Sequence, residues 1–371
     1  MRPTLADARR IVVKIGTNLL AGGGSGFQTA AAAAIVQQTA QLHRLGKQVI
    51  LVSSGAIGLG AHRLGISGRI RKISMRQACS AVGQPLLMGE YNELFRQHDI
   101  PIAQVLLTRE LLNNRESYLN IQATVEHLLK LGIVPICNEN DSVSTTEIGP
   151  VFGDNDNLSA HIASKLDADL LVLLTDIDAL YTSDPRTSST AKPLRLIAQI
   201  TPEIQQSAAG SGSELGTGGM KTKLEAVEIA ARAGTSVVIA DGQAADVLIR
   251  ILQDEEIGTL FLSGPKVKSR LRWILNTTPH GTLQVDHGAI KALQAGKSLL
   301  PKGVTGVSGS FRAGEVVAIN NQFHAVTRMD KGQIERIMGL HSSQIPDVLG
   351  SLTSTVIAQA EDIVRLERNN V

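Results

Sequence analysis

The feature that most constrains the fold of this 371-residue chain is a series of short Val/Ile/Leu runs that alternate with longer segments of helical periodicity. Strands of a parallel sheet that is covered on both faces appear as continuous apolar runs. We expect strands at residues 11–15, 48–53, 102–107, 133–137, 169–175 and 236–240 and helices that include 29–46, 74–98 and 223–233. This order predicts an α/β domain with helices on both faces of a mainly parallel sheet.

Composition narrows the class of protein. Apolar residues make up 43% of the chain and aromatic residues only 3%, so we expect an aliphatic core. The formal net charge of +2 argues against a dedicated nucleic-acid binder, which normally carries a basic stripe. The two cysteines, Cys79 and Cys137, favour a reducing compartment and plain buried thiols. Because neither a signal-peptide pattern nor a run of about 20 apolar residues is present, we expect a soluble, cytoplasmic protein without a membrane contact.

A smaller second domain is indicated near the C-terminus. A change occurs around residues 264–281, where the stretch SGPKVKSRLRWIL is basic and contains the only tryptophan, Trp273. Beyond Gly281 the segments become short and rich in glycine, which is typical of hairpins in a small β domain. We therefore expect a large domain at 1–265, a linker at 266–280 and a β domain with a C-terminal tail at 281–371.

The stretch GPVFGDNDNLSAHIAS, residues 149–164, collects short polar side chains directly before a helical pattern that begins at Leu158. One such residue is enough to cap a helix. A calcium loop would need Gly at its sixth position and Glu at its twelfth, but counting from Asp154 these positions hold Ser159 and Lys165. Helix capping and a ligand site at the edge of the sheet therefore remain open for Asp154, Asn155, Asp156 and Asn157.

Four further loops follow predicted strands and suit anions, although neither a Rossmann fingerprint nor a Walker A motif is present. In VVKIGTN, Lys14 lies in a buried strand, where a charge is costly without a partner. In VSSGAIGLG, hydroxyl and backbone N–H groups open a helix, and such ends bind carboxylate or phosphate. The glycines of GTGGMKTK let the backbone approach a ligand closely. In LLTDIDALYTSDPR, Thr175 and Asp176 stand at the end of the apolar strand. A snorkelling lysine, a simple cap and a flexible surface loop remain alternatives.

Together these segments resemble the amino acid kinase family. The matches are VVKIGTN, VSSGAI, NENDSVSTTEI, GDNDNLSA, LLTDIDALYTSDPR and GTGGMKTKLEAV, over about residues 10–260 and in the family's order. NEND, GDNDN and GTGGM-x-TK resemble the branch that phosphorylates glutamate, whereas Asn18 and Ala179 depart from a usual Ser and Gly. The tail, with LLPKG and GSFRAGEVV, is similar to a PUA domain. The resemblance implies a three-layer α/β/α kinase fold followed by a small β-rich PUA domain.

The activity that this resemblance implies is the ATP-dependent phosphorylation of the side-chain carboxylate of L-glutamate, which gives L-glutamyl 5-phosphate and opens proline biosynthesis. It also implies ATP with Mg²⁺, feedback inhibition by proline and a homo-oligomer. A glutamate side chain, with a pKa of about 4.3, is already ionised at neutral pH, so no general base is needed. Catalysis then consists of positioning and of neutralising charge. We identify no metal ligand, because Mg²⁺ normally arrives with the nucleotide.

The resemblance also implies roles for individual residues. Lys14 and Lys223 match the lysines that flank the phosphates, and Asp156 is the candidate carboxylate that keeps both charged. We expect Asp156→Asn to lower kcat far more than stability. The expected substrate-binding residues are Ser54, Gly55, Asp141, Asp154 and Asn155. The expected ATP-binding residues are Lys14, Gly16, Thr175, Asp176, Thr217, Gly218, Gly219, Met220, Lys221, Thr222 and Lys223.

Two alternative functions remain. A sibling such as aspartokinase, acetylglutamate kinase or uridylate kinase would share the sheet and the lysines but differ in its substrate loops. An RNA-binding or RNA-modifying protein is the second alternative, because PUA domains often bind RNA. Residues 281–371, however, carry nine Lys/Arg against eight Asp/Glu and offer only Phe311 and Phe323 for stacking. Residues 59–80 suit either a mobile flap or a solvated loop.

Overall fold

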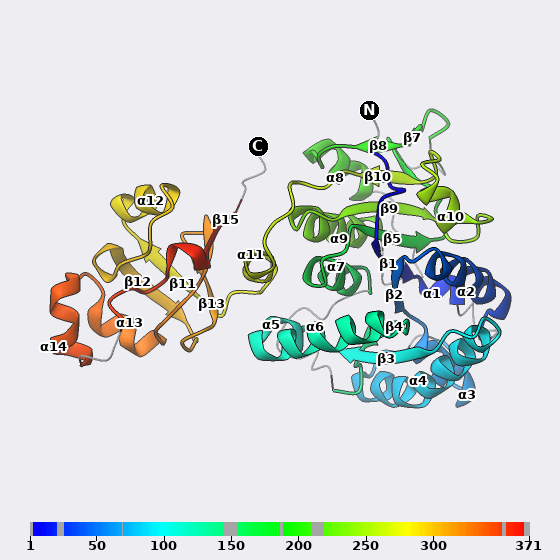
Figure 1. Ribbon diagram of the computed structural model, residues 1–371, viewed down its shortest axis with the longest axis horizontal. Coiled ribbons are helices and arrows are strands. Elements are labelled where there is room, and N and C mark those ends of the chain that lie inside the picture. The colour runs from blue at the N-terminus through cyan, green and yellow to red at the C-terminus, as the bar shows by residue number, and fades with distance from the viewer. Residues whose placement is uncertain are drawn as a thin grey trace. The chain divides into compact units, whose positions relative to one another are not determined.

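The computed structural model describes residues 3–20, 26–68, 70–143, 155–183, 185, 188–209, 219–350 and 354–366 (Figure 1). The chain divides into two compact units. The first consists of Met1–Leu111 with Leu119–Lys266, and the second of Leu112–Tyr118 with Val267–Val371. In the part of the chain that the structure describes, no helix is both long and apolar enough to cross a bilayer.

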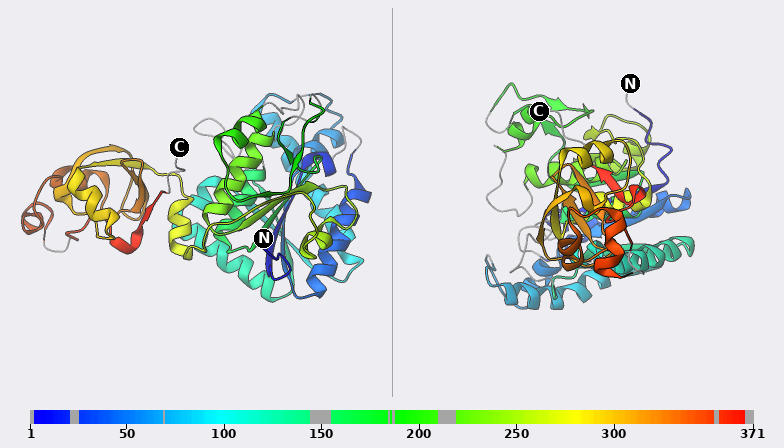
Figure 2. Two further views of the ribbon diagram at one scale, coloured as in Figure 1. Left: turned by 90° about the horizontal axis from the view of Figure 1, so that it is seen from above. Right: turned by 90° about the vertical axis from the view of Figure 1, so that its left-hand side faces the viewer.

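An eight-stranded sheet forms the centre of the first unit, in the order β3-β4-β2-β1-β5-β9-β10-β8 (Figures 1 and 2). Neighbouring strands run parallel except for β9 and β10, so the expected mainly parallel sheet is confirmed. The strands of this sheet are β1 Arg10–Ile15, β2 Gln48–Ser53, β3 Ile102–Leu107, β4 Val134–Glu139, β5 Leu170–Thr175, β8 Leu196–Ile197, β9 Ser236–Asp241 and β10 Thr259–Phe261. A separate pair consists of β6 Leu180–Tyr181 and β7 Pro193–Leu194.

Helices cover both faces of this sheet, which explains why its strands read as continuous apolar runs. The helices that start before residue 267 are α1 Thr17–Leu20, α2 Thr29–Arg44, α3 Ala56–Arg63, α4 Ile73–Arg96, α5 Arg109–Asn113, α6 Arg115–Lys130, α7 Asn155–Lys165, α8 Pro202–Ala209, α9 Met220–Arg232 and α10 Val247–Leu252. Figure 1 shows α7 and α9 on one side of the sheet and α2 and α10 on the other.

The pleat of β1 sends its side chains alternately to these two faces. Ile11, Val13 and Ile15 join the aliphatic core that includes residues of α2, α4 and α10. Lys14 therefore projects from the opposite face, the one that α7 covers. A lysine in the middle of a buried strand thus reaches a helix rather than the solvent.

Helices α3 and α4 contain most of residues 59–80, so this stretch is neither an open loop nor wholly solvated. They cross at two glycines. An added Cβ at Gly60 would lie 1.8 Å from the carbonyl oxygen of Cys79, and one at Gly83 would lie 1.8 Å from that of Ala56. Because only a residue without a side chain fits between the two backbones, Gly60 and Gly83 hold α3 directly against α4.

A five-stranded sheet in the order β12-β11-β13-β14-β15 organises the second unit. Its strands are β11 Gly281–Val285, β12 Val304–Gly309, β13 Val316–Ile319, β14 Phe323–Val326 and β15 Ile363–Arg365. Its helices are α11 Ser269–Leu275, η2 Pro301–Gly303, α12 His287–Gln294, α13 Lys331–Ile337, η3 Ser342–Gln344, α14 Ile345–Leu349 and η4 Ala360–Asp362. The segment that we expected to be a linker, 266–280, contains α11.

Aromatic side chains of the second unit lie inside it rather than on its surface. Trp273 of α11 packs in a small buried cluster with Tyr118, and the Arg115 guanidinium lies 5.0 Å from the Trp273 ring centre. Phe311 and Phe323 are buried in the core of the sheet. The expectation that these two phenylalanines offer stacking faces is therefore wrong, because both rings serve the core.

Candidate active site

Three charged side chains meet at the carboxyl edge of the large sheet. Lys14 comes from the end of β1, Asp156 from the first turn of α7 and Lys223 from the first turn of α9. Lys14 Nζ lies 2.6 Å from Asp156 Oδ1, and Lys223 Nζ lies 3.2 Å from Asp156 Oδ2. The two lysines are 3% and 4% exposed and the aspartate 0%. The structure thus brings together the three residues for which the sequence suggested catalytic roles, which we call the Lys–Asp–Lys cluster.

The Lys–Asp–Lys cluster combines two positive charges with one negative charge away from water. An isolated buried charge is very costly, but a shared carboxylate offsets that cost for both lysines. The first turn of α7 also favours a negative side chain because of the helix dipole. The formal charges of these three side chains sum to +1, a balance that suits an anionic ligand at this edge of the sheet.

A second group of polar side chains surrounds the tip of β2. Asn155 Nδ2 donates to the backbone oxygen of Ser53 at 2.8 Å, to Ser54 Oγ at 2.9 Å and to Asn138 Oδ1 at 3.0 Å. Its neighbour Asp156 belongs to the Lys–Asp–Lys cluster. Asn155 therefore connects the positively charged cluster to the ends of β2 and β4.

Gly55 turns the chain from β2 into α3 with φ +103°, a left-handed conformation that glycine adopts without strain. This turn leaves the first backbone N–H groups of α3 beside the buried Ser54 hydroxyl. Hydroxyl and N–H donors in such a position can bind a carboxylate. Of the expected substrate residues, Ser54, Gly55 and Asn155 thus lie together, and Asp154 lies outside the described residues.

Asp141 lies just beyond β4 and accepts a hydrogen bond from Ser80 Oγ of α4 at 2.8 Å. Burial raises the pKa of the Asp141 carboxyl above its ordinary value, although Ser80 and the Arg76 charge oppose this shift. A partly buried carboxylate of this kind gains from a cationic partner. Asp141 can therefore bind an ammonium group.

On the other side of β1 lie residues that we expected to bind ATP. Thr175 Oγ1 donates to Asp176 Oδ1 at 3.0 Å, and Asn18 Nδ2 donates to Asp176 Oδ2 at 3.1 Å. Burial alone would raise the pKa of Asp176, but these two hydrogen bonds, a backbone N–H and the charge of Lys223 together lower it. An added Cβ at Gly16 would lie 3.2 Å from the backbone oxygen of Leu174 and 3.9 Å from Lys14 Nζ, so glycine avoids a tight contact beside Lys14.

In the first turn of α9, some of the remaining expected ATP-binding residues are buried and others are exposed. Met220 and Lys223 point inward and are buried, whereas Lys221 is exposed. Thr222 Oγ1 donates to the backbone oxygen of Gly219 at 2.8 Å. Gly219 has φ −76°, which any residue can adopt, and an added Cβ there would meet nothing within 4 Å. Thr217 and Gly218 lie outside the described residues.

Sequence reasoning missed three polar residues of this site. Asn138 belongs to the quoted NEND motif, while Ser80 and Gln84 lie four residues apart on one face of α4. Register places Cys137 beside Val52 and Val52 beside Lys14, so Asn138 is level with Ser53. Asn138 therefore projects from the face opposite Lys14, toward α4. The motif could have indicated Asn138, but no local pattern distinguishes Ser80 or Gln84.

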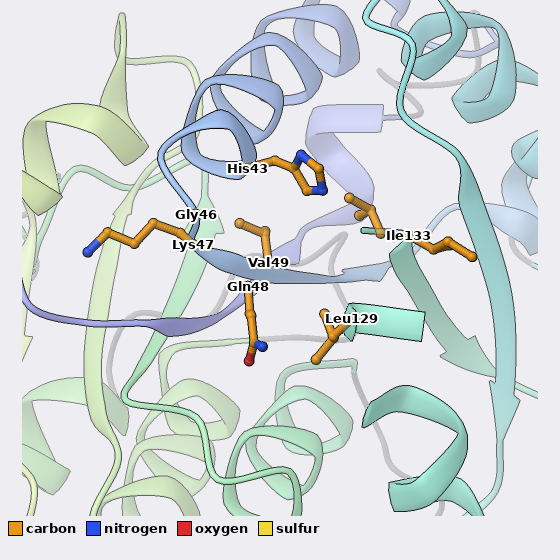
Figure 3. Close-up of a pocket in the computed structure, with 8 residues that line it drawn as sticks. His43, Gly46, Lys47, Gln48, Val49, Leu129 and Ile133 are labelled. Carbon is orange, nitrogen blue, oxygen red and sulfur yellow. The ribbon is translucent and has the colours of Figure 1, made fainter. Parts of the chain in front are cut away.

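The pocket drawn in Figure 3 lies at the opposite edge of the sheet, where β2 and β4 begin. It has a volume of about 150 Å³. Its lining residues are His43, Gly46, Lys47, Gln48, Val49, Leu129, Ile133 and Val134. Because none of them lies at the carboxyl edge, this pocket is separate from the site. Among the described residues, no three His, Cys, Asp or Glu side chains gather in a way that could hold a metal ion.

His161, a buried residue of α7, should make the free energy of unfolding depend on pH. Burial, together with the charges of Lys165 and Arg109, lowers its pKa to about 3. The unfolded chain takes up this proton near pH 6.5, so stability is full above pH 6.5 and falls as the pH drops toward 3. Between pH 7.5 and 5, urea unfolding should show a loss about 2 kcal/mol larger for the natural protein than for His161→Gln. Equal losses would contradict this assignment.

Comparison with known proteins agrees with this geometry. The sequence pattern of the amino acid kinase family matches residues 9–241, and that of the PUA domain matches residues 281–349. The chain is 42% identical to the glutamate 5-kinase of Methanosarcina mazei, over 98% of each chain. It is 44% identical to that of Carboxydothermus hydrogenoformans, over 99% of this chain and 100% of the relative.

These matches, on a doubly covered parallel sheet with lysines at its carboxyl edge, show that the chain belongs to the amino acid kinase family. Within that family its full-length relatives place it among the glutamate 5-kinases, with a PUA domain at its C-terminus.

Proposed function

We propose that this chain transfers the terminal phosphoryl group of ATP to the side-chain carboxylate of L-glutamate, the reaction that opens proline biosynthesis. The observation that carries the proposal is the Lys–Asp–Lys cluster. In it two ammonium groups lie 2.6 and 3.2 Å from the two oxygens of one carboxylate. Both reactants are negatively charged, so their repulsion is the main obstacle. Buried positive charges aimed at the transferring group are the means to overcome it.

Each residue of the cluster has a separate task in this reaction. We assign Lys14 to the β- and γ-phosphates and Lys223 to the charge on the transferring group. Asp156 orients both amines, because each of its oxygens faces one lysine. Thr175, Asp176 and the first turn of α9 would border the nucleotide, together with Thr217 and Gly218.

Magnesium fits this site as a companion of the nucleotide. The described residues supply no three-ligand cluster, and Mg²⁺ commonly binds through phosphates and water. When bound, Mg²⁺ neutralises phosphate charge. The chain's own contribution is to hold the two ammonium groups in place around the phosphates.

Glutamate itself would be held beside β2 and β4. Asp141 binds its ammonium group, while Ser54 and the N–H groups after Gly55 bind the carboxylate end of the substrate. Asn155, whose amide holds Ser54 in place, faces the substrate beside them, with Asp154 nearby in sequence. We also propose, from the family alone, that L-proline inhibits the enzyme and that the chain forms a homo-oligomer.

Asp141→Asn should raise the KM for L-glutamate on the order of 100-fold and leave the KM for ATP nearly unchanged, because it removes the charge that faces the ammonium group. Since burial raises the pKa of Asp141, kcat/KM for glutamate should begin to fall at a higher pH than for an ordinary aspartate as the medium is acidified. Steady-state kinetics of both substrates across pH would measure these effects. An unchanged KM for glutamate would remove Asp141 from this role.

The proposed reaction is tested by coupled ADP release with L-glutamate, L-aspartate, N-acetylglutamate and UMP, each with and without L-proline. We expect turnover with L-glutamate alone among the four, and inhibition by proline. Turnover with another acceptor and none with glutamate would assign the chain to a sibling activity.

A further inference from the structure

Gln84 of α4 carries a buried hydrogen-bond donor for which the described residues supply no acceptor. The side chain is 7% exposed. Its Oε1 accepts from Asn138 Nδ2 at 2.8 Å, but its Nε2 has no hydrogen-bond partner among the described residues. Leaving a buried amide N–H without an acceptor is costly, so such a group requires an explanation.

The direction of this amide follows from its neighbours. The backbone N–H of Glu139 donates to Asn138 Oδ1 at 2.9 Å, and Asn155 Nδ2 donates to the same oxygen at 3.0 Å. Asn138 must therefore direct its NH₂ group toward Gln84, and the side-chain oxygen of Gln84 accepts this hydrogen bond. Because a backbone N–H can only donate, the chain of bonds leaves Gln84 Nε2 pointing away from Asn138 as a donor.

The position of Gln84 relates this donor to the amino-acid substrate. One helical turn earlier on the same face of α4, Ser80 contacts Asp141, the residue that we assign to the ammonium group. The strand order β1-β2-β4 places Asn138 about 10 Å from β1, which carries Lys14. A glutamate whose side-chain carboxylate lies at the Lys–Asp–Lys cluster would therefore extend its amino-acid end toward Asp141 and Gln84.

We infer that Gln84 Nε2 donates a hydrogen bond to the α-carboxylate of the bound amino acid, which makes Gln84 a further substrate-binding residue. This inference rests on the proposed function. Recognition of an oxygen by a preplaced donor discriminates strongly against ligands that lack it, because the buried N–H is then left unpaired. Gln84 would thus select substrates that carry a carboxylate next to the ammonium group.

The test compares Gln84→Met, which keeps the shape but removes the donor, with the natural enzyme. We expect a KM for L-glutamate about 10- to 100-fold higher, because the bond is made to a charged group. The KM for ATP should not change, and kcat should stay within about threefold. Gln38→Met is the matched control: Gln38 is also buried and uses both ends of its amide, with Ala34 and Leu248, but in α2, far along the chain from these residues. It should leave the KM for glutamate unchanged.

A ligand comparison distinguishes substrate binding from a structural role. 4-Aminobutyrate has the same side-chain carboxylate and an ammonium group but no α-carboxylate, so Gln84→Met should leave its inhibition constant unchanged. Equal weakening of both ligands, or an unchanged KM for glutamate, would overturn the inference. Should Gln84→Met not fold, the isosteric Gln84→Glu answers the same question when it is compared with the natural enzyme at each pH. Its KM for glutamate relative to that of the natural enzyme should be raised at neutral pH and should recover as the pH is lowered, and a pH-independent ratio would contradict the inference. Absence of glutamate turnover in the natural enzyme would instead refute the proposed function.

Discussion

Asp156→Asn is expected to lower kcat for L-glutamate on the order of 100- to 1000-fold, the effect of removing one preorganised stabilising group. The substitution leaves Lys14 and Lys223 facing each other without the carboxylate that lies 2.6 and 3.2 Å from their amines. Two such amines repel each other, and no shared carboxylate then fixes their positions. The positive charge that faces the transferring phosphoryl group is therefore less well oriented.

The same variant should also be less stable than the sequence alone suggests. Because Asp156 is 0% exposed, removing its charge breaks a buried ion pair, which typically costs about 3–5 kcal/mol. Bound nucleotide should recover part of this loss. Urea unfolding with and without ATP would measure both effects, and kcat should be determined at a temperature where the variant is folded.

Asp169→Asn provides the matched control. Asp169 is a carboxylate just before β5, where its Oδ2 accepts from the backbone N–H groups of Arg9 and Arg10 at 2.9 Å and its Oδ1 from Lys266 Nζ at 2.6 Å. It lies at the edge of the sheet opposite the Lys–Asp–Lys cluster, so its loss should lower stability but not kcat. Natural turnover by folded Asp156→Asn would contradict the role that we give to Asp156.

Gly83→Ala should prevent folding or destabilise the chain by about 3 kcal/mol or more, because overpacking against backbone cannot be relieved by a side-chain rotation. The new Cβ would lie 1.8 Å from the carbonyl oxygen of Ala56, the first residue of α3. Since Gly55 and Ser54 directly precede α3, a displaced α3 should also weaken glutamate binding. The free energy of unfolding and the KM for glutamate would measure the two effects.

Gly89→Ala, six residues later on the same helix, is the control for this prediction. An added Cβ at Gly89 meets nothing within 4 Å. Alanine is the better helix former by about 1 kcal/mol, so this variant should be slightly more stable than the natural protein. If Gly83→Ala and Gly89→Ala were equally stable, the close crossing of α3 and α4 would be refuted.

Local patterns predict the frame of this protein because its strands are buried on both faces. The runs at 48–53 and 102–107 coincide with β2 and β3 residue by residue. Element boundaries differ by a few residues: α9, for example, begins three residues before the expected Lys223. The crossing of α3 and α4 could not be predicted, since it depends on two glycines that are 23 residues apart and meet only in the folded chain.

Some residues of the site could likewise be identified from the sequence, and others could not. Lys14 could be identified because a charge inside an apolar strand demands a partner, and the resemblance suggested Asp156 as that partner. Ser80 and Gln84 could not be identified, because their importance follows from contacts with Asp141 and Asn138 across the fold. Likewise, Lys221 and Lys223 look alike in sequence, and only the direction of the first turn of α9 separates the exposed lysine from the buried one.

The central claim is that Lys14, Asp156 and Lys223 act as one unit on the transferring phosphoryl group. The most direct test is kcat for L-glutamate in Asp156→Asn, in Lys223→Met and in the double variant, each at saturating MgATP. Groups that act together lose little more when both are removed, so the account predicts that all three values agree within about tenfold. A double variant whose loss equals the product of the two single losses would contradict it, because independent groups multiply their effects.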